Sequence, residues 1–567
     1  MKTASVETFP DARSRETARL DLGRNLIVEA GAGTGKTTLL VERMLFLILG
    51  GMEGGAAPVD CERLVALTFT ERAAAEIKSR LALRLDKIAA GIQGGALARE
   101  DEGLIRELER SFARPKEQVL DLALAALRGL GRAQIGTIHS FCSTLLRLYP
   151  LEAEVDPDFS VDPDEEALDE LFEAEWSLWL DGELAKDAPR TRAWRKVLGK
   201  ATLDDLGSMA RAFLQPRADL AKARSSPGTA AALRAMAESA SRLREGRSKP
   251  RGRILEHLDW MRERFSVCAA AVEGAPAGSS PPPATLHAPA WPADWSEDGK
   301  EEYKDLSKVA ASLVPSSEGL LRDALAVLEP FVLAVRERYR TMGHITFDGL
   351  LIGARDLLRD HPSARAELKA RFSAVLVDEF QDTDPVQGEL LMFLGEEEGS
   401  CARRWQDVRP APGKLFVVGD PKQSIYRFSG ADIHALQSFA AHLESNGAAR
   451  CALQTNFRSS PAIIAAVNRV FPALLRQVPG LQAGYLPIHP RPGADTEGEP
   501  PRWIDASGAR EAGERPPDAE ESRRAEADWI ARWIEQERGA YALKDIAILL
   551  RSASPLTLYL EALRRRG

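Results

Sequence analysis

Short runs of apolar and β-branched residues, each followed by a polar turn, recur along the chain. The run Leu26 to Val28 precedes a glycine-rich loop and a mostly apolar stretch from 39 to 49. Similar runs begin near 65, 134, 372 and 414, with predicted helices such as 71–87 between them. Buried strands that alternate with helices are typical of a parallel sheet flanked by helices. The pattern therefore predicts an α/β fold.

Between about 151 and 340 the pattern becomes mainly helical. Segment 242–253 carries six positive charges against one acid, and 271–300 is dense in Pro, Ala, Gly and Ser. We interpret the first as a phosphate-contacting arm, although such runs more often form a solvated helix face, and the second as a flexible loop. A final apolar run at 546–550 predicts one more strand.

The expected domain organisation has four parts. Residues 1–150 and 341–450 form one α/β domain in two pieces, and 151–340 form a helical insertion. Residues 451–567 form part of a second α/β domain. A chain of 567 residues is long enough for several such domains.

Composition narrows the class of protein. The net charge of −9 excludes a general polycation, so any contact with nucleic acid must use local basic faces. Five cysteines lie far apart with no Cys-x-x-Cys, which argues against a zinc ribbon or a disulfide framework and favours a reducing cytoplasm. The N-terminus lacks the apolar core of a signal peptide, and apolar runs are too short to span a bilayer. We therefore expect a cytoplasmic protein without a membrane partner.

Residues 30–37, with the sequence AGAGTGKT, stand between a predicted strand and a predicted helix. This is the pattern of a phosphate-binding P-loop, although Ala30 replaces the usual first glycine. Lys36 is expected to reach the β- and γ-phosphates of ATP, and the Thr37 hydroxyl to bind Mg²⁺. The predicted nucleotide-binding residues of this segment are Ala30, Gly31, Ala32, Gly33, Thr34, Gly35, Lys36, Thr37 and Thr38.

Two carboxylates follow the apolar strand near 372–378. Asp378 is expected to hold Mg²⁺, and Glu379 to orient and deprotonate the attacking water. The carboxyl ends of parallel strands share one edge of the sheet, which is also where the P-loop should lie. Without other motifs, a strand that ends in Asp-Glu is as often followed by a solvated turn as by a functional site.

Two further segments carry candidate groups. In 419–426, Gln423 could sense the γ-phosphate, and Tyr426 together with the nearby Phe428 could present rings to bases. In 455–459, Arg458 could stabilise charge as an arginine finger does, and Phe457 could form a platform for adenine. For each aromatic residue, simple core packing is the alternative.

Six motifs together resemble those of the UvrD/Rep-type superfamily 1 DNA helicases. The wording DPKQSIYRF and the long insertion are most similar to the RecB/AddA branch, which works in double-strand-break repair. The motifs are AGAGTGKT (30–37), LTFTERAAAE (67–76), GTIHSF (136–141), VDEFQDT (377–383), GDPKQSIY (419–426) and NFRS (456–459).

The resemblance implies RecA-like P-loop domains and a role for each matched residue. Asp378 and Glu379 would form the Mg²⁺ and water pair, and Gln423 and Arg458 would contact the γ-phosphate. Phe457 stands where the family usually has a tyrosine that stacks on adenine. Base stacking suits a translocating motor because it tolerates any sequence. The implied single-strand DNA track comprises Thr68, Phe69, Thr70, Thr137, His139, Ser140, Tyr426 and Phe428.

The resemblance also implies the activity: an ATP-dependent 3′→5′ DNA helicase or translocase that acts on single-stranded DNA and duplex ends in repair and recombination. A second helicase/nuclease subunit is an implied partner. Arg15 stands near the place of a glutamine that reads adenine in the family, and Ser429 near that of an arginine. The last two helicase motifs and a nuclease domain have no match, so we expect a fragment of a longer chain or a degenerate protein. The rival interpretation is an ATP- and DNA-binding subunit that does not unwind.

Overall fold

The computed structural model divides the chain into two compact units. The first comprises Met1–Asn456 and Leu475–Leu486, and the second comprises Phe457–Leu474 and Pro487–Gly567. The structure describes residues 9–52, 57–185, 188–218, 220, 229–245, 253–272, 303–304, 306–307, 309–310, 318–426, 430–478, 482–494, 501, 518–537 and 541–567.

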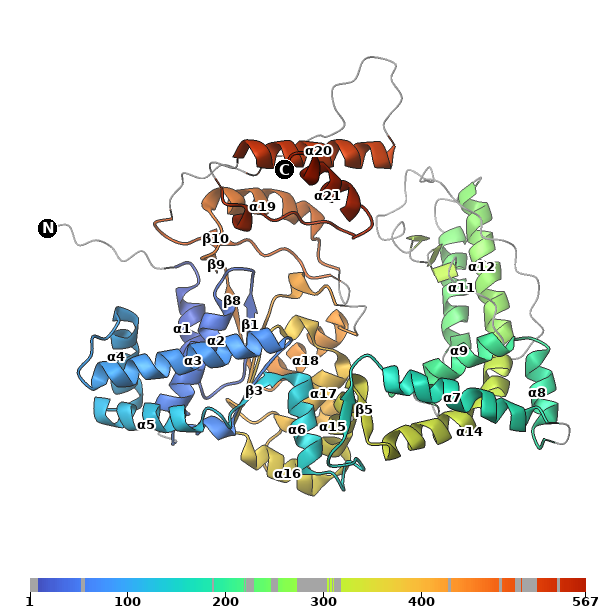
Figure 1. Cartoon of the computed structure of the whole chain (residues 1–567), viewed down its shortest axis with the longest axis horizontal. Helices are drawn as coiled ribbons and strands as arrows, with labels where there is room; N and C mark the ends of the chain where they lie inside the picture. Colours follow the sequence, from blue (N-terminus) through green and yellow to red (C-terminus); the bar gives the residue numbers. More distant parts are fainter. Residues whose placement is uncertain are drawn as a thin grey trace, which may run out of the picture. The chain divides into compact units, whose positions relative to one another are not determined.

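A parallel sheet of six strands forms the centre of the first unit (Figure 1). Its spatial order is β3-β2-β6-β7-β1-β8, and every neighbouring pair is parallel. Strands β2, β6 and β7 are buried along their whole length, as expected when helices cover both faces of a parallel sheet. The strands are β1 (Leu26–Ala30), β2 (Leu64–Thr68), β3 (Gln134–Thr137), β6 (Ala374–Val377), β7 (Leu415–Gly419) and β8 (Ala449–Leu453).

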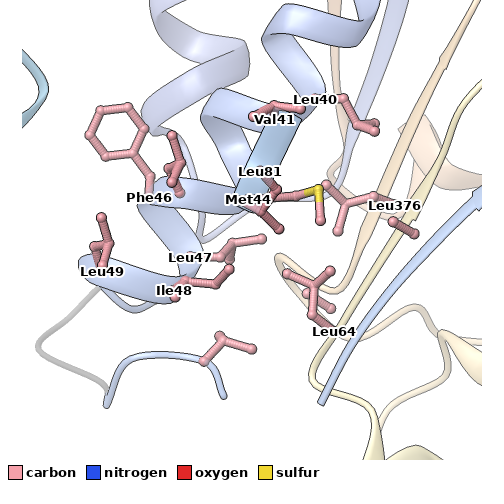
Figure 2. Close-up of a cluster of buried hydrophobic side chains, with 14 of the residues drawn as sticks. Leu40, Val41, Met44, Phe46, Leu47, Ile48, Leu49, Leu64, Leu81 and Leu376 are labelled. Atoms are coloured by element: carbon pink, nitrogen blue, oxygen red, sulfur yellow. The ribbon is translucent and has the colours of Figure 1, made fainter. Parts of the chain in front are cut away.

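Alternation along the strands divides the core into two clusters. On β6, Leu376 joins one cluster, whereas Val375 and Val377 join the other. On the first face the apolar side of α2 packs against the sheet, with Met44 directed toward Leu376 (Figure 2). The helices of this face are α1 (Ala12–Leu20), α2 (Lys36–Leu49), α3 (Glu71–Ile92), α4 (Arg99–Phe112) and α5 (Lys116–Gly129).

Helices that follow the later strands cover the second face. They bring Leu145, Leu351 and Leu390, among others, into contact with the sheet. The loops after β1, β2, β6 and β7 all leave from the carboxyl edge, where ligands bind in open parallel sheets. The helices of this face are α6 (Ile138–Leu148), α15 (Phe347–Asp360), α16 (Pro362–Arg371), α17 (Pro385–Leu394) and α18 (Ile433–Ser445).

The helical insertion has two small cores of its own. An aromatic cluster around Trp194 and Phe331 joins α7, α8, α9 and α14, and a second cluster around Phe265 joins α11 and α12. Residues 273–300 of the expected flexible loop lie outside the described residues. The elements are β4 (Ser160–Asp162), α7 (Glu166–Glu183), α8 (Thr191–Leu198), α9 (Leu203–Leu214), α11 (Thr229–Glu245), α12 (Arg253–Val272), α14 (Glu318–Thr341) and β5 (His344–Thr346).

Two features near the C-terminal end differ from expectation. Cys451, the expected start of the second domain, lies in β8, which pairs with β1 of the first sheet. The strand predicted at 546–550 is wrong: Ile548 and Leu550 pack on the core of the second unit, but this segment pairs with no strand among the residues described.

The second unit is mainly helical in its described part. Its elements are α19 (Pro461–Leu474), β10 (His489–Pro490), α20 (Ala519–Glu537) and α21 (Leu556–Arg565). Its small core joins α20 and α21 through Ala527, Ala531, Tyr559 and Ala562. Among the residues described in the two units, no helix has the length and apolar character needed to cross a membrane.

Candidate functional site

The loop after β1 has the backbone geometry of an anion cradle. Gly33 and Gly35 have φ values of 73° and 86°, a region that glycine adopts without strain. The buried Thr34 hydroxyl donates to the Gly31 carbonyl oxygen over 2.7 Å and tightens the loop. Helix α2 then begins at Lys36 with no acidic residue in its first turn. Its unpaired N–H groups therefore favour a negatively charged ligand.

Lys36 lies at the centre of this edge. Its Nζ atom is 2.7 Å from Oε2 of Glu379, and the Lys36 side chain is only 11% exposed. The Gln381 amide donates to the same Glu379 oxygen over 2.8 Å. Glu379 adopts a left-handed backbone conformation, with φ of 51°, that turns the chain directly after β6. A phosphate that reached Lys36 would compete with the Glu379 carboxylate for its ammonium group.

Asp378 is buried beside this pair. Its backbone N–H donates to Leu67 on the neighbouring strand, and its carboxylate accepts from the Glu379 N–H over 3.0 Å. Burial, together with the negative charge of Glu379, raises the pKa of Asp378 to about 6. The same two causes raise the pKa of Asp382 to about 6. A bound cation would lower both pKa values.

The donor chemistry at this edge fits Mg²⁺. Asp378 and Thr37 offer hard oxygen ligands, which Mg²⁺ prefers. The described residues contain no cluster of three His, Cys, Asp or Glu side chains that could hold a metal. Mg²⁺ commonly takes only one or two protein ligands and completes its shell with water and substrate phosphates. The predicted pair therefore suits an ion that arrives with a nucleotide.

Gln381 connects two strand ends, a role that the sequence analysis did not identify. Its amide nitrogen contacts Glu379, and its oxygen accepts from the Asp420 N–H over 2.7 Å. Asp420 in turn accepts from the amide of Gln423 over 2.8 Å. A Cβ at Gly419 would approach the Gln381 oxygen to 2.6 Å, so this contact requires glycine. Gln381 stands two positions after Glu379 in the quoted motif, which could have identified it.

Two residues of the predicted DNA track cap the helices that follow their strands. Thr70 caps α3 by accepting from the Ala73 N–H over 3.1 Å. Thr137 caps α6 by accepting from the Ser140 N–H, and it donates to Glu71 over 2.8 Å. Their hydroxyls therefore have local structural roles in addition to the predicted one.

The aromatic part of the track is partly exposed. The rings of Phe69 and Tyr426 lie 4.7 Å apart, and Phe69 is exposed. The buried Thr68 hydroxyl has no hydrogen-bond partner within the described ranges. Phe428, also predicted here, lies outside the described residues. The Phe69–Tyr426 pair thus offers an accessible ring surface beside the carboxyl edge.

A second ring pair was not predicted. His139 lies 4.7 Å from Phe347, which is exposed at the start of α15. Burial lowers the pKa of His139.

An ion-pair cluster lies next to Phe347 in the sequence. Arg217, from the insertion, donates to both oxygens of Asp348 and to one oxygen of Asp384, over 2.5 to 2.9 Å. In the sequence, the short strand segment 344–346 followed by Phe347 and Asp348 is the signal that could have identified Phe347 and Asp348 as site residues.

The remaining predicted residues belong to three different parts of the chain. Phe457 and Arg458 belong to the second unit, so their roles at the nucleotide stay predictions. Of the basic segment 242–253, Arg244 forms an ion pair with Asp259 over 2.8 Å. Thr37 and Thr38 lie in the first turn of α2, with Thr38 exposed.

The sequence of the chain is similar to those of known proteins. The model of the UvrD/REP helicase N-terminal domain matches residues 11–444. The A subunit of the ATP-dependent helicase/nuclease of Moorella thermoacetica is 30% identical over 83% of this chain and 35% of its own length. The protein of the same name from Desulforudis audaxviator is 29% identical over 81% of this chain and 39% of its own length. The "RecBCD enzyme subunit RecB" of Escherichia coli K12 is 27% identical over the same two shares, 81% and 39%. The chain thus aligns with less than half the length of each.

Proposed function

The chain belongs to the UvrD/REP helicase family, and we propose that it is an ATP-dependent DNA helicase or translocase of 3′→5′ polarity. The proposed setting is double-strand-break repair and recombination, in agreement with the helicase/nuclease names of its relatives. A second helicase/nuclease subunit is the proposed partner. The observation that carries the proposal is the convergence of Lys36, Asp378 and Glu379 at one edge of the sheet.

Each group has a distinct part in the proposed reaction. The Gly33 and Gly35 turn and the α2 N-terminus bind the phosphates, and Lys36 exchanges its contact with Glu379 for a phosphate oxygen. Glu379, released from Lys36, becomes free to accept a proton from the attacking water. Mg²⁺, held by Thr37 and Asp378, would neutralise charge on the phosphates. The proposed roles of Arg458 at the γ-phosphate and of Phe457 at the adenine rest on the NFRS motif (456–459) alone.

The route by which DNA could influence hydrolysis also starts at this edge. Phe69 directly follows β2, whose Leu67 carbonyl accepts from the Asp378 N–H over 2.8 Å. A base that stacks on the Phe69–Tyr426 pair would therefore contact a residue only two positions after Leu67, which is hydrogen-bonded to Asp378. The proposed DNA arm is the helical insertion 151–340, and the proposed second lobe begins after the last strand of the first sheet.

The decisive experiment measures ATP hydrolysis by the 567-residue chain with and without an oligothymidine strand. We expect DNA to stimulate turnover. Lys36→Ala should abolish nucleotide binding or turnover, because no other cation in the described loop replaces its charge. Glu379→Gln should keep ATP affinity and lose turnover by on the order of 10²-fold or more.

Two controls separate the alternatives. Unwinding of duplexes with a 3′ or a 5′ tail tests polarity, since a 3′→5′ motor would open only the 3′-tailed duplex. Binding of ATP and DNA without stimulated turnover would instead favour a non-motor binding subunit. Hydrolysis by Lys36→Ala at the rate of the unsubstituted chain would contradict the ATPase assignment.

A further inference from the structure

Two carbonyl groups of the phosphate-binding loop are held by side chains from distant parts of the chain. The Asn456 amide donates to the Ala32 carbonyl oxygen over 2.7 Å. The Arg15 guanidinium donates through Nη1 to the Thr34 carbonyl oxygen over 2.9 Å. Both donors lie outside the loop, and both contacts are with main-chain atoms. The loop is therefore constrained at alternate residues.

This constraint determines where the loop N–H groups point. In a trans peptide the C=O and the following N–H point in opposite directions. The Ala32 carbonyl shares its peptide with the N–H of Gly33, and the Thr34 carbonyl shares its peptide with that of Gly35. Holding these carbonyls toward Asn456 and Arg15 turns both N–H groups the opposite way, as an anion-binding nest requires.

Arg15 is itself fixed on three sides. Its Nε and Nη2 atoms donate to the two oxygens of Asp11 over 3.1 and 2.9 Å. Nη2 also donates to the Thr455 carbonyl oxygen over 3.1 Å. Because the guanidinium is planar, these contacts orient Nη1 toward Thr34. A flexible ammonium group would not be oriented in this way.

Asp11 joins this arrangement to the segment that leads into the second unit. It is 5% exposed and accepts from the Gln454 N–H, the Thr455 N–H and the Thr455 hydroxyl over 2.6 to 3.0 Å. Burial favours the protonated form, but the hydrogen bonds from Arg15 and Thr455 outweigh it and lower the pKa of Asp11 to about 2. The carboxylate thus remains ionised at neutral pH.

We propose that Arg15 and Asn456 are positioning residues that preorganise the phosphate-binding loop for nucleotide, and that Asp11 couples this preorganisation to segment 454–456. The inference rests on the proposed ATP site and adds a route of control. Asn456 is followed by Phe457, the first residue of the second unit. Tension or displacement of that segment reaches the loop carbonyls directly, so the segment tunes phosphate affinity.

The test compares the affinities of the 567-residue chain and its variants for ATP, ADP and AMP. Arg15→Lys keeps the positive charge but removes the planar guanidinium that donates to the Thr34 carbonyl. Asn456→Ala removes the amide that donates to the Ala32 carbonyl. Each should weaken ATP and ADP binding about tenfold or more, the effect of one hydrogen bond from a charged or well-placed donor. AMP affinity should change little, because the loop holds the β- and γ-phosphates. Arg13→Lys, at an exposed position of the same helix, is the matched control.

Hydrogen exchange supplies a second readout. The amides of residues 31–37 should exchange faster in Arg15→Lys and Asn456→Ala, while those of the buried strands β6 and β7 should not. Failure of the unsubstituted chain to bind ATP would refute the proposed function itself. Normal ATP binding by the chain, with unchanged affinity and exchange in both variants, would overturn the positioning role. Equal weakening for AMP and ATP would also overturn it, and if Arg15→Lys fails to fold, Asn456→Ala decides alone.

Discussion

The parallel sheet and the helical insertion use charged residues in opposite ways. At the sheet edge, Lys36 and Glu379 are 343 positions apart in sequence, but their side chains approach to 2.7 Å. They meet because Lys36 follows the loop after β1 and Glu379 follows the end of β6, and both strands end at this edge. In the insertion, charged residues mostly bind one another along helix surfaces, as Arg211 does with Asp169 and Glu173. Strand register thus concentrates chemistry at one edge, whereas helix faces distribute charge over a surface.

The two regions also have separate cores. The sheet is packed by the two clusters on its faces, and the insertion by its aromatic cluster and the α11–α12 cluster. Separate cores allow one region to open without the other. The insertion should then be dispensable for nucleotide binding yet required for contact with DNA duplex.

Trp194→Ala gives the largest expected effect and tests this separation. Trp194 is 1% exposed and donates to Glu183 over 2.9 Å, so its removal should destabilise the insertion by about 3–5 kcal/mol. Hydrogen exchange should rise in α7, α8 and α9, while ATP affinity stays unchanged. Leu178→Ala, at a position 70% exposed on α7, should change stability by less than about 0.5 kcal/mol. Loss of ATP binding in Trp194→Ala would show that the regions form one cooperative unit.

Asp378→Asn probes the cost of concentrating charge at the sheet edge. The pKa of Asp378 is raised to about 6 in the folded chain, above its usual 3.8, by burial and the charge of Glu379. The folded state therefore binds more protons between pH 4 and 6, and stability falls as pH rises through that window. Without nucleotide or Mg²⁺, the substitution should raise stability above pH 6 by about 1–3 kcal/mol and weaken Mg²⁺-dependent ATP binding.

Denaturant unfolding at pH 4 and pH 8 provides the measurement. The stability gain of Asp378→Asn should be present at pH 8 and disappear near pH 4. Asp121→Asn, at an exposed position of α5, is the matched control and should show no such difference. An equal gain at both pH values would mean that packing, rather than ionisation, separates aspartate from asparagine here.

The residues at the carboxyl edge of the sheet are well predicted from the sequence, because the apolar strands and the polar groups that directly follow them are both visible in short segments of the chain. Apolar runs mark β1, β6 and β7, and parallel pairing requires the groups that follow them to share an edge. The same kind of run at 546–550 fails as a strand, since pairing depends on a neighbour that local pattern cannot reveal. The Gln381 bridge and the Arg15 contacts escape prediction for the same reason. In the sequence, Arg15 is notable only because it stands near the place of a glutamine in the family. Its positioning role depends on contacts with Asp11, Thr34 and Thr455, which only the folded chain brings together.

The smallest expected effect concerns the basic segment 242–253 of the insertion. Diffuse electrostatic binding predicts that single substitutions do little and that the effect accumulates with each charge removed. Arg244 is left unchanged because it already pairs with Asp259. Neutralising Arg242, Arg247 and Arg251 to Gln should weaken duplex binding and reduce the log–log salt slope by up to about three, nearly one unit for each DNA phosphate that is no longer neutralised.

The control for this prediction removes equal charge from the other region. Arg106, Arg110 and Arg128 are exposed on α4 and α5, outside the insertion, and their change to Gln alters net charge by the same amount. If the basic segment contacts phosphates, only the insertion variant should flatten the slope, because counterion release depends on local phosphate neutralisation rather than total charge. Equal flattening in both variants would reduce the effect to net charge. An unchanged slope in the insertion variant would leave the segment as a solvated helix face and place the duplex contacts elsewhere.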